Sequence, residues 1–426
     1  MSEKPSKKQD AGKVLLEELS GGPPNHQLSA WRRIGRTMLV PLLAVISGLI
    51  LGAFLIALTS ENFYNAWSVS PWEAVKAGWN EVRLAYGALF AGSIGDPVRI
   101  IDALRSGDAL AIRRAFNPIL ESLTASTPFI FASLAVALGF RSGVFNIGAE
   151  GQLFVGAIFA AFVGYSIKGL PAIIHIPLSL LAGALGGAIW GFIPGWLKAK
   201  TGGHEVINTI MMNYVAFRLS DWLLSGPMKR PDSFNPVSPT IQPSAMLPRF
   251  FQEPIRFHLG FFIALFTAWL VYWLLFRTRW GFDLRSVGLN PRASRYAGMS
   301  TVMVTIMAMT LSGALAGLAG TNEVLGLNHN LALAFSSGYG FDSIALALLG
   351  KNHPVGVVLA SLLFGTLRTG ATRMQVVAQI PVDIITVLQA FILIFIAAPA
   401  IIRTIYRLRA PEIEEEEVTI RGWGGG

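Results

Sequence analysis

The sequence contains no cysteine among its 426 residues, which excludes disulfides, thiolate metal sites and cysteine nucleophiles. Charged residues are also scarce: they make up 14% of the chain, whereas soluble domains carry roughly 25%. Hydrophobic residues make up 53%. This balance indicates that lipid is the main solvent of the protein. We therefore expect one membrane domain, and not the two or three soluble domains that the length alone would suggest.

The motifs that carry enzymatic chemistry are missing as well. There is no G-x-x-x-x-G-K-[ST] loop, so the chain does not bind ATP by that mechanism, and no G-x-S-x-G nucleophile elbow appears. None of the histidines forms H-E-x-x-H, so their spacing gives no support to a metal site. We expect no catalytic residue, no metal and no cofactor of the chain's own. The histidines are His26, His175, His204, His258, His329 and His353.

The basic residues point to a membrane rather than to nucleic acid. The formal net charge is +9, but Lys and Arg gather in the N-terminal tail and between apolar segments, where cytoplasmic loops need them. We interpret them as topology signals and headgroup contacts, and we expect no nucleic-acid partner. A polar tail, residues 1–36, precedes the first apolar run and is too long to belong to a cleavable signal peptide.

Apolar runs fill most of the remaining chain. Met38–Thr59 would rise about 33 Å as a helix, enough to cross the hydrocarbon core, and we expect it to be a retained anchor. Counting it, we predict an all-α polytopic bundle of about ten spans over residues 37–405. The other predicted spans are Ile119–Phe140, Gly151–Tyr165, Ala172–Trp196, Glu205–Leu224, Leu259–Phe276, Thr301–Leu325, Phe341–Gly350, Val355–Leu367 and Val382–Ile402.

Two of these runs are short. Phe341–Gly350 and Val355–Leu367 cannot each cross about 30 Å as straight helices. Either they recruit flanking residues or they are half-helices packed inside protein, where irregular backbone at membrane depth is tolerated. We therefore expect some broken or short helices.

Lys and Arg also predict the orientation. The basic tail places the N-terminus in the cytoplasm, and ten crossings place the C-terminus there too. Residues 277–300 then form a cytoplasmic loop, and residues 406–426 form a cytoplasmic acidic tail. Residues 60–118, where tryptophans mix with charges, are expected to be an external interfacial insertion. The proline-rich loop Pro227–Phe257 is expected to be an ordered external cap.

Small residues recur inside the spans, as in Gly183–Gly191 and Gly313–Gly317. Small residues four apart let helix backbones approach closely in lipid. We favour close packing between helices of this chain over a dimerisation face.

Two polar stretches interrupt the apolar runs. In Arg141–Gln152, glycines permit departures from helix, while Asn146, Glu150 and Gln152 bring amide and carboxylate groups that cannot face lipid. Gly202–Tyr214, read as a helix from Glu205, carries Asn208 and Asn213 on an otherwise apolar helix. In both stretches two alternatives stay open: the polar groups pair within the protein, or they line a solute path.

The third polar stretch is the loop Arg277–Ser300. Asn290 is suited to cap a helix that begins at Pro291, and Gly298 is placed to end it after about two turns. A short, capped, basic helix would suit docking to a soluble partner, whereas a plain connector would not need both caps.

At this point the sequence resembles the permeases of bacterial ABC importers for nucleosides and simple sugars, which are related to the ribose and branched-chain amino acid permeases. Four stretches in family order carry the resemblance, and with the span order they cover about residues 38–405. His204 stands where the family often has Asn. The stretches are GVFNIGAEGQ (143–152), EVINTIMMN (205–213), VGLNPRASRYAG (287–298) and GYGFDSIALALLGKNHP (338–354).

The resemblance implies a permease in the bacterial inner membrane that pairs with a second permease or with itself. It implies that cytoplasmic ATPase domains bind the ATP and that an extracytoplasmic binding protein delivers a small polar solute. Nucleoside, base and simple sugar all stay open. The implied pathway residues are Asn146, Glu150, Gln152, Asn208 and Asn213. The implied coupling residues, seated in an ATPase cleft, are Gly288, Asn290, Pro291, Arg292, Arg295, Tyr296 and Gly298.

An ion-coupled secondary transporter is the alternative hypothesis. Such a protein needs a membrane-embedded carboxylate as its coupling site, and Glu150, Asp342 and Asp383 are the candidates.

Overall fold

The structure, a computed structural model, describes residues 30–408, without the side chains of 30–38, 41, 382–383, 396–397 and 399. The predicted acidic tail and most of the predicted N-terminal tail therefore lie outside the described residues. Within the described range every named element is a helix, and the only β pairing consists of two isolated bridges. The predicted all-α fold is confirmed.

The helices are α2 (Ala30–Thr59), α3 (Glu61–Trp67), α4 (Pro71–Ser93), α5 (Pro97–Ser106), α6 (Ala109–Arg141), α7 (Ala149–Ser166), α8 (Ala172–Thr201), α9 (Glu205–Ser225), η1 (Pro243–Ala245), α10 (Gly260–Arg277), α11 (Arg279–Leu289), α12 (Pro291–Tyr296), α13 (Thr301–Asn322), η2 (Glu323–Asn328), α14 (Tyr339–Leu349), α15 (Pro354–Ala378), α16 (Val382–Ala397) and α17 (Pro399–Ile405).

Seven helices in the described range are long and apolar enough to cross a membrane. They confirm a polytopic membrane protein. Of the ten predicted spans, three do not meet this measure: α14 and α16 are too short, and α9 is not apolar enough. Sequence alone left two possibilities for the short runs, and the two runs differ. Phe341–Gly350 is a short helix, α14, whereas Val355–Leu367 belongs to the first half of the 25-residue α15.

Glycines pack α8 against α13. A Cβ atom added to Gly187 would lie 2.7 Å from the Cα of Gly317, and one added to Gly191 would lie 3.0 Å from the Cα of Gly313. The two backbones therefore touch along this seam, and dispersion contacts replace the hydrophobic drive that lipid does not provide. The predicted close packing within the chain is confirmed.

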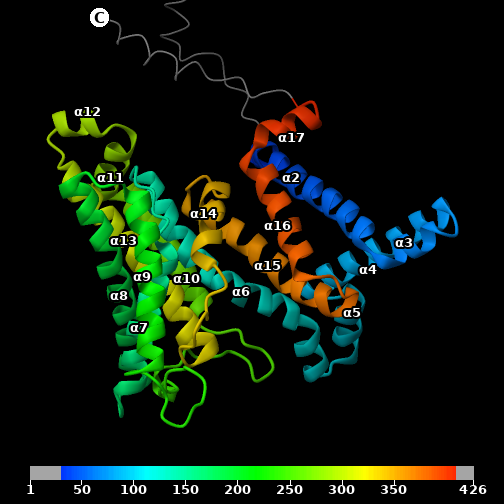
Figure 1. The fold of residues 1–426 in the computed structure, drawn as a ribbon, viewed down its shortest axis with the longest axis horizontal. Helices are drawn as coiled ribbons and strands as arrows, with labels where there is room; N and C mark the ends of the chain where they lie inside the picture. Colours follow the sequence, from blue (N-terminus) through cyan, green and yellow to red (C-terminus); the bar gives the residue numbers. More distant parts are fainter. Residues whose placement is uncertain (1–29, 409–426) are drawn as a thin grey trace, which may run out of the picture.

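The longest helix, α6, runs through the middle of the bundle (Figure 1). From Ser126 to Gly139 nearly all its residues are buried, and α7, α10, α13, α14 and α15 all contact it. It begins at Ala109, ten residues before the predicted start, because Asp108 caps it by accepting hydrogen bonds from the backbone N–H groups of Leu110 and Ala111. The described helix thus takes in part of the predicted insertion.

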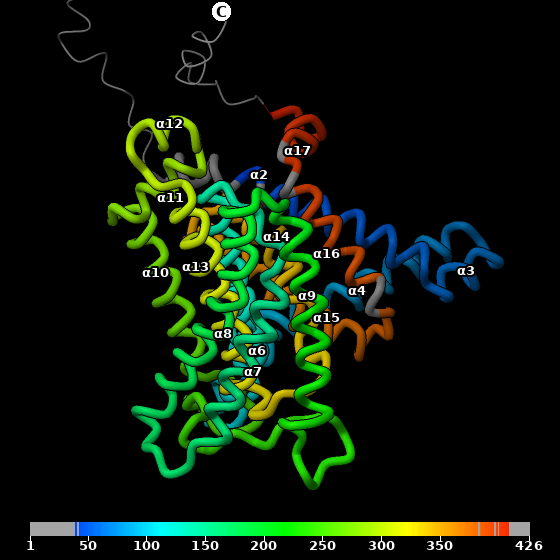
Figure 2. The backbone as a smooth tube through the Cα atoms, turned by 60° about the vertical axis from the view of Figure 1, so that its left-hand side comes forward, coloured from blue at the N-terminus to red at the C-terminus, as the bar shows by residue number. Residues whose placement is uncertain are grey.

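The segment 60–118 is also packed more closely than the sequence analysis expected. In α4, Ala85 and Leu89 are buried in an apolar cluster with Leu367 and Met374 of α15. The α3 end projects from the body (Figure 2), where Trp67 and Trp72 are exposed, and α5 buries only Ala103. An amphipathic pattern does not distinguish a lipid surface from a neighbouring helix, which explains the difference.

The two ends of the bundle differ. The α11–α12 turn lies at the same end as α17 and the start of α2, and the long loop 226–259 lies at the other end (Figure 1). Backbone hydrogen bonds attach this loop to the chain that follows α13, from Ser238 to Leu331, from Ile241 to His329 and from Leu247 to Leu325. The loop is ordered, as its prolines predict.

Candidate functional site

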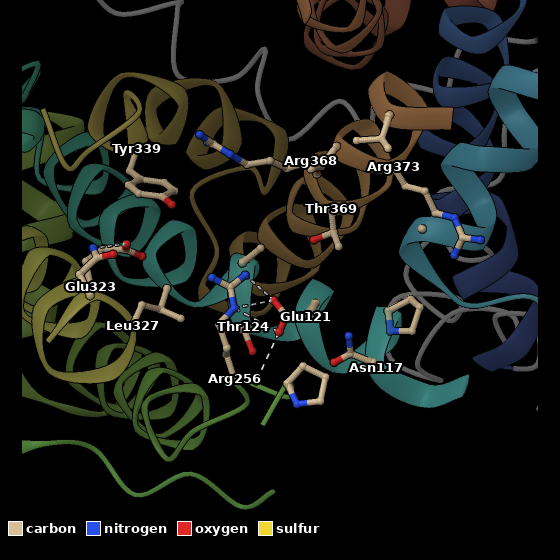
Figure 3. A pocket seen from close by; sticks show the side chains of 17 residues that line it. Asn117, Glu121, Thr124, Arg256, Glu323, Leu327, Tyr339, Arg368, Thr369 and Arg373 are labelled. Atoms are coloured by element: carbon tan, nitrogen blue, oxygen red, sulfur yellow. Dashed lines mark hydrogen bonds and ion pairs between the residues drawn. The ribbon is translucent and has the colours of Figure 1, made fainter. Parts of the chain in front are cut away.

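A polar cavity of about 690 Å³ lies beside the loop-capped end of α6. This volume falls within the range of about 300–1,000 Å³ that small-molecule sites occupy. Its walls come from α6, η2, the start of α14 and α15 (Figure 3). On α15 the rim includes Val376, which is 75% exposed. The cavity therefore opens along this face of α15.

One wall of the cavity is closed by an ion pair. Arg256, from the loop before α10, donates from Nη2 to Oε2 of Glu121 at 2.6 Å and from Nε to both carboxylate oxygens at 3.2 and 3.3 Å. This paired geometry is the strong, directional form of an arginine–carboxylate contact. It ties the loop to α6 at the mouth of the cavity, as the dashed lines of Figure 3 mark.

Aromatic and guanidinium groups form a second wall. The guanidinium carbon of Arg368 lies 4.9 Å from the ring centroid of Tyr339 and 5.5 Å from that of Phe129. Arg368 also donates a hydrogen bond to Ser337 and forms a long ion pair of 3.9 Å with Asp342. These contacts hold flat groups at the cavity surface, where they favour planar ligands.

Glu323 lies on the same side of the cavity as Tyr339 (Figure 3). It is only 4% exposed, yet its Oε1 atom has no hydrogen-bond partner in the protein. The residue begins η2, where the helix widens to a π-helix. Such segments are rare and occur often at functional sites.

Four of the five predicted pathway residues pair within the protein, and three of these four are amides. Asn146 donates to Gln152 and to Ser312, each at 2.8 Å, and Asn213 accepts from the N–H of Gly151 at 2.8 Å and donates to the carbonyl of Ile147. All three are buried. These bonds tie the α6–α7 turn to α9 and α13.

Glu150 and Asn208 complete the predicted set. Glu150 is buried, and its Oε2 accepts the backbone N–H of Gly340 at 2.5 Å, which fixes the start of α14. Asn208 is half-buried near Gly203. None of the five residues lines the 690 Å³ cavity. Asn146, Glu150, Gln152 and Asn213 instead hold α7 to the neighbouring helices. Their contact with solute stays a prediction.

The short helix predicted in the loop Arg277–Ser300 is present as α12. Asn290 caps it by accepting the N–H of Ala293 at 3.0 Å, Pro291 is its first residue, and Gly298 adopts a φ of +85° just beyond it. Tyr296 is 95% exposed, and Arg292 is exposed too. The helix projects from the end of the bundle with a basic, accessible surface.

The base of this projection is fixed to α6. A Cβ atom at Gly288 would lie 2.3 Å from the carbonyl oxygen of Arg141, and one at Gly143, whose φ is +71°, would lie 2.9 Å from the Cα of Gly288. No side chain larger than hydrogen fits between these backbones. Helix α6 therefore touches the α11–α12 turn at one end and lines the cavity at the other.

Sequence reasoning missed the cavity residues. Glu121, Arg256, Glu323 and Arg368 are each single charges on apolar segments or in a loop, and they are separated by as many as 247 positions. A charged residue within a span is a functional signal, so Glu121, Glu323 and Arg368 could have been singled out, but their convergence could not. In the described part of the chain, no three His, Asp or Glu side chains are placed to hold a metal ion.

His258 is buried and lies near the end of the long loop 226–259, just before α10. Burial, together with Arg249, His329 and Arg256, lowers the pKa of its imidazole to about 4. Its Nδ1 accepts the N–H of Gly260 at 3.1 Å. The neutral imidazole therefore packs between the long loop 226–259 and η2.

The chain is similar to known membrane permeases. Residues 118–397 match the family described as branched-chain amino acid transport system / permease component. The guanosine ABC transporter permease protein NupP of Bacillus subtilis is 39% identical over 372 residues, which cover 86% of this chain and 94% of that protein. The nucleoside ABC transporter permease protein NupB of Lactococcus lactis is 32% identical over 392 residues, 90% of this chain and 97% of that protein.

A third relative differs in its solute. The glucose ABC transporter permease protein TsgB13 of Haloferax volcanii is 37% identical over 287 residues, which cover 65% of this chain and 75% of that protein. No solved structure matches the chain significantly.

Proposed function

We propose that this chain imports nucleosides across a bacterial inner membrane. It belongs to the family of branched-chain amino acid transport system permease components. It is therefore a membrane permease subunit of an ABC importer and not an enzyme. Two relatives match this chain over nearly their whole length, and they are named for guanosine and for nucleosides. The polar cavity with a flat Tyr339–Arg368 wall suits such a solute better than an all-aliphatic one.

The cavity is the proposed solute path. Its open rim on α15 leaves one side for a second permease to cover, so that two chains enclose the solute between them. A homologue or a second copy could take this position. An extracytoplasmic binding protein delivers the solute at the end that carries the loop 226–259, where Arg256 and Glu121 close the mouth.

Energy enters at the other end. Helix α12 docks in a cleft of a cytoplasmic ATPase, with Arg292, Arg295 and Tyr296 on the docking surface. ATP binding changes which arrangement of the two permeases has the lower free energy. The observation that carries this proposal is the backbone contact between Gly288 and Arg141, because it joins the docking helix directly to the helix that lines the cavity.

The proposed topology has ten crossings with both ends inside. Helices α9 and α16 cross in addition to the seven apolar helices, and the tenth crossing combines residues 329–338 with α14. In support, α12, α17 and the start of α2 lie at one end of the bundle (Figure 1). The eleven residues of α14 rise only about 16 Å, and Glu150 fixes its start inside the protein.

Uptake into membrane vesicles tests the function. The chain is coexpressed with its ATPase and permease partner, and labelled guanosine, adenosine and glucose are supplied with the binding protein. We expect nucleoside uptake that needs internal ATP and survives an uncoupler. Uptake of glucose alone would refute the solute assignment, and uptake driven by an ion gradient without ATP would refute the mechanism.

The ion-coupled alternative is not favoured. The named relatives are permeases of ABC transporters, and the carboxylate of Glu150 holds the N–H of Gly340. Asp342 lies 3.9 Å from Arg368, and the side chain of Asp383 is outside the described residues.

A further inference from the structure

The starting observation is a buried carboxylate oxygen without a partner. Oε1 of Glu323 makes no hydrogen bond within the protein, and Oε2 has only a long contact of 3.5 Å with Nδ2 of Asn328. An acceptor removed from water and left unpaired destabilises the fold. Since the residue lines the cavity, a donor on a bound molecule can supply what the protein does not.

The neighbours of Glu323 indicate that a molecule bound in the cavity is planar. The ring of Tyr339 lines the same side of the cavity, with the guanidinium of Arg368 4.9 Å from its centroid. Figure 3 shows Glu323 and the Tyr339 ring on the same side of the cavity. Flat groups of this kind stack on heteroaromatic rings.

A second unpaired acceptor lies in the same cavity. The Oδ1 atom of Asn117, on α6, is buried and also has no partner in the protein. The residues that line the cavity thus include two buried acceptor oxygens without a partner and an aromatic ring. Its complement is a planar solute with N–H donors on its edge.

From these contacts we propose that Glu323 is the specificity-determining residue of the cavity, and that it accepts the ring N–H of a lactam-type purine such as guanine or hypoxanthine while the ring stacks on Tyr339. This inference rests on the proposed nucleoside import and names the solute class within it. A carboxylate is suited to this task because it only accepts hydrogen bonds, and it therefore rejects a ring nitrogen that is itself an acceptor.

The test compares guanosine with 1-methylguanosine, which lacks the ring N–H. Both are supplied in one mixture, with different labels, to vesicles that contain the whole importer. The ratio of the two uptakes does not depend on how much protein is inserted. In Glu323→Gln we expect the preference for guanosine to fall about 5- to 10-fold, because the amide oxygen of Gln still accepts the ring N–H and only the extra strength of a hydrogen bond to a charged group is lost.

The matched control is Glu61→Gln, which makes the same change on the exposed α3 and should leave the ratio unchanged. A ratio that is also unchanged in Glu323→Gln, with uptake retained, overturns the proposal. If the wild-type importer takes up glucose and no nucleoside, the proposed function itself fails, which is a different result.

A second pair of variants decides the question if Glu323→Gln does not insert. Tyr339→Phe keeps the ring and serves as the reference for its removal. Tyr339→Leu removes it and should lower guanosine uptake at least 5-fold relative to Tyr339→Phe, because base stacking contributes roughly 1–3 kcal/mol. Equal guanosine uptake by these two variants, normalised to inserted protein, overturns the proposed site.

Discussion

Replacing Gly288 with alanine should separate ATP hydrolysis from solute uptake. The added methyl carbon would lie 2.3 Å from the carbonyl oxygen of Arg141 and 2.9 Å from the backbone N of Gly143, whereas ordinary contact begins at 3.4 Å. The α11–α12 turn must therefore move away from α6 by roughly 1 Å. Neither neighbour is the end of a flexible side chain, so the backbone has to shift.

The size of the effect follows from this contact. Overpacking of this kind costs about 1–3 kcal/mol, which corresponds to a change of roughly 5- to 150-fold in an equilibrium constant. If the turn transmits the force of the ATPase to α6, the loss appears in the coupling step. We expect nucleoside uptake per inserted molecule to fall about 10-fold, while ATP hydrolysis by the complex continues.

The assay measures both activities in the same proteoliposomes. Gly87→Ala is the matched control, because a Cβ atom at Gly87, in the middle of α4, meets nothing within 4 Å. It should leave uptake and hydrolysis unchanged. A Gly288→Ala importer with the normal number of solutes carried per ATP would refute the reasoning, because the contact would then play no part in coupling.

Four further predictions follow from other contacts. Charge reversal at both Arg292 and Arg295 should abolish uptake while the chain still inserts, as measured by vesicle transport and by the yield of purified permease. Glu150→Ala leaves a buried backbone N–H unpaired and should lower stability by about 1–3 kcal/mol, detected as a lower melting temperature in detergent. Gly317→Leu should prevent stable folding, because a Cβ atom there already lies 2.4 Å from a backbone oxygen of α8; a normal yield and melting temperature would contradict this. With a pKa of about 4 for His258, the unfolded chain takes up the proton near pH 6.5 and the folded chain only near pH 4. Stability should therefore fall by at most about 3 kcal/mol as the pH drops through this window, and His258→Asn should flatten the dependence.

The capped helix shows how much local sequence decides. Asn290, Pro291 and Gly298 act on backbone groups within a few residues, so their order alone predicted where α12 begins and ends. The same holds for the helix-packing glycines on α8 and α13, since a surface of small residues can be read along one helix. In each case the pattern has one physical meaning wherever the helix lies.

The cavity shows where such prediction ends. Glu121, Arg256 and Glu323 come from α6, a loop and η2, and nothing in their spacing announces that they meet. The polar residues that stood out in the sequence, Asn146 and Asn213, proved to be paired inside the protein. Sequence shows that a buried amide needs a partner, but it does not show whether the partner is a helix or a solute.

The amino-acid sequence by itself determined that this chain is a helical membrane protein without a P-loop for nucleotide binding. It also determined that a capped basic helix lies in one of its loops. These properties depend on composition and on contacts between near neighbours. Only the tertiary structure decided that α6 joins that helix to a polar cavity and that Glu323 lines the cavity with one carboxylate oxygen unpaired. Such facts depend on which backbones pack together, and that is a sum of many distant contacts.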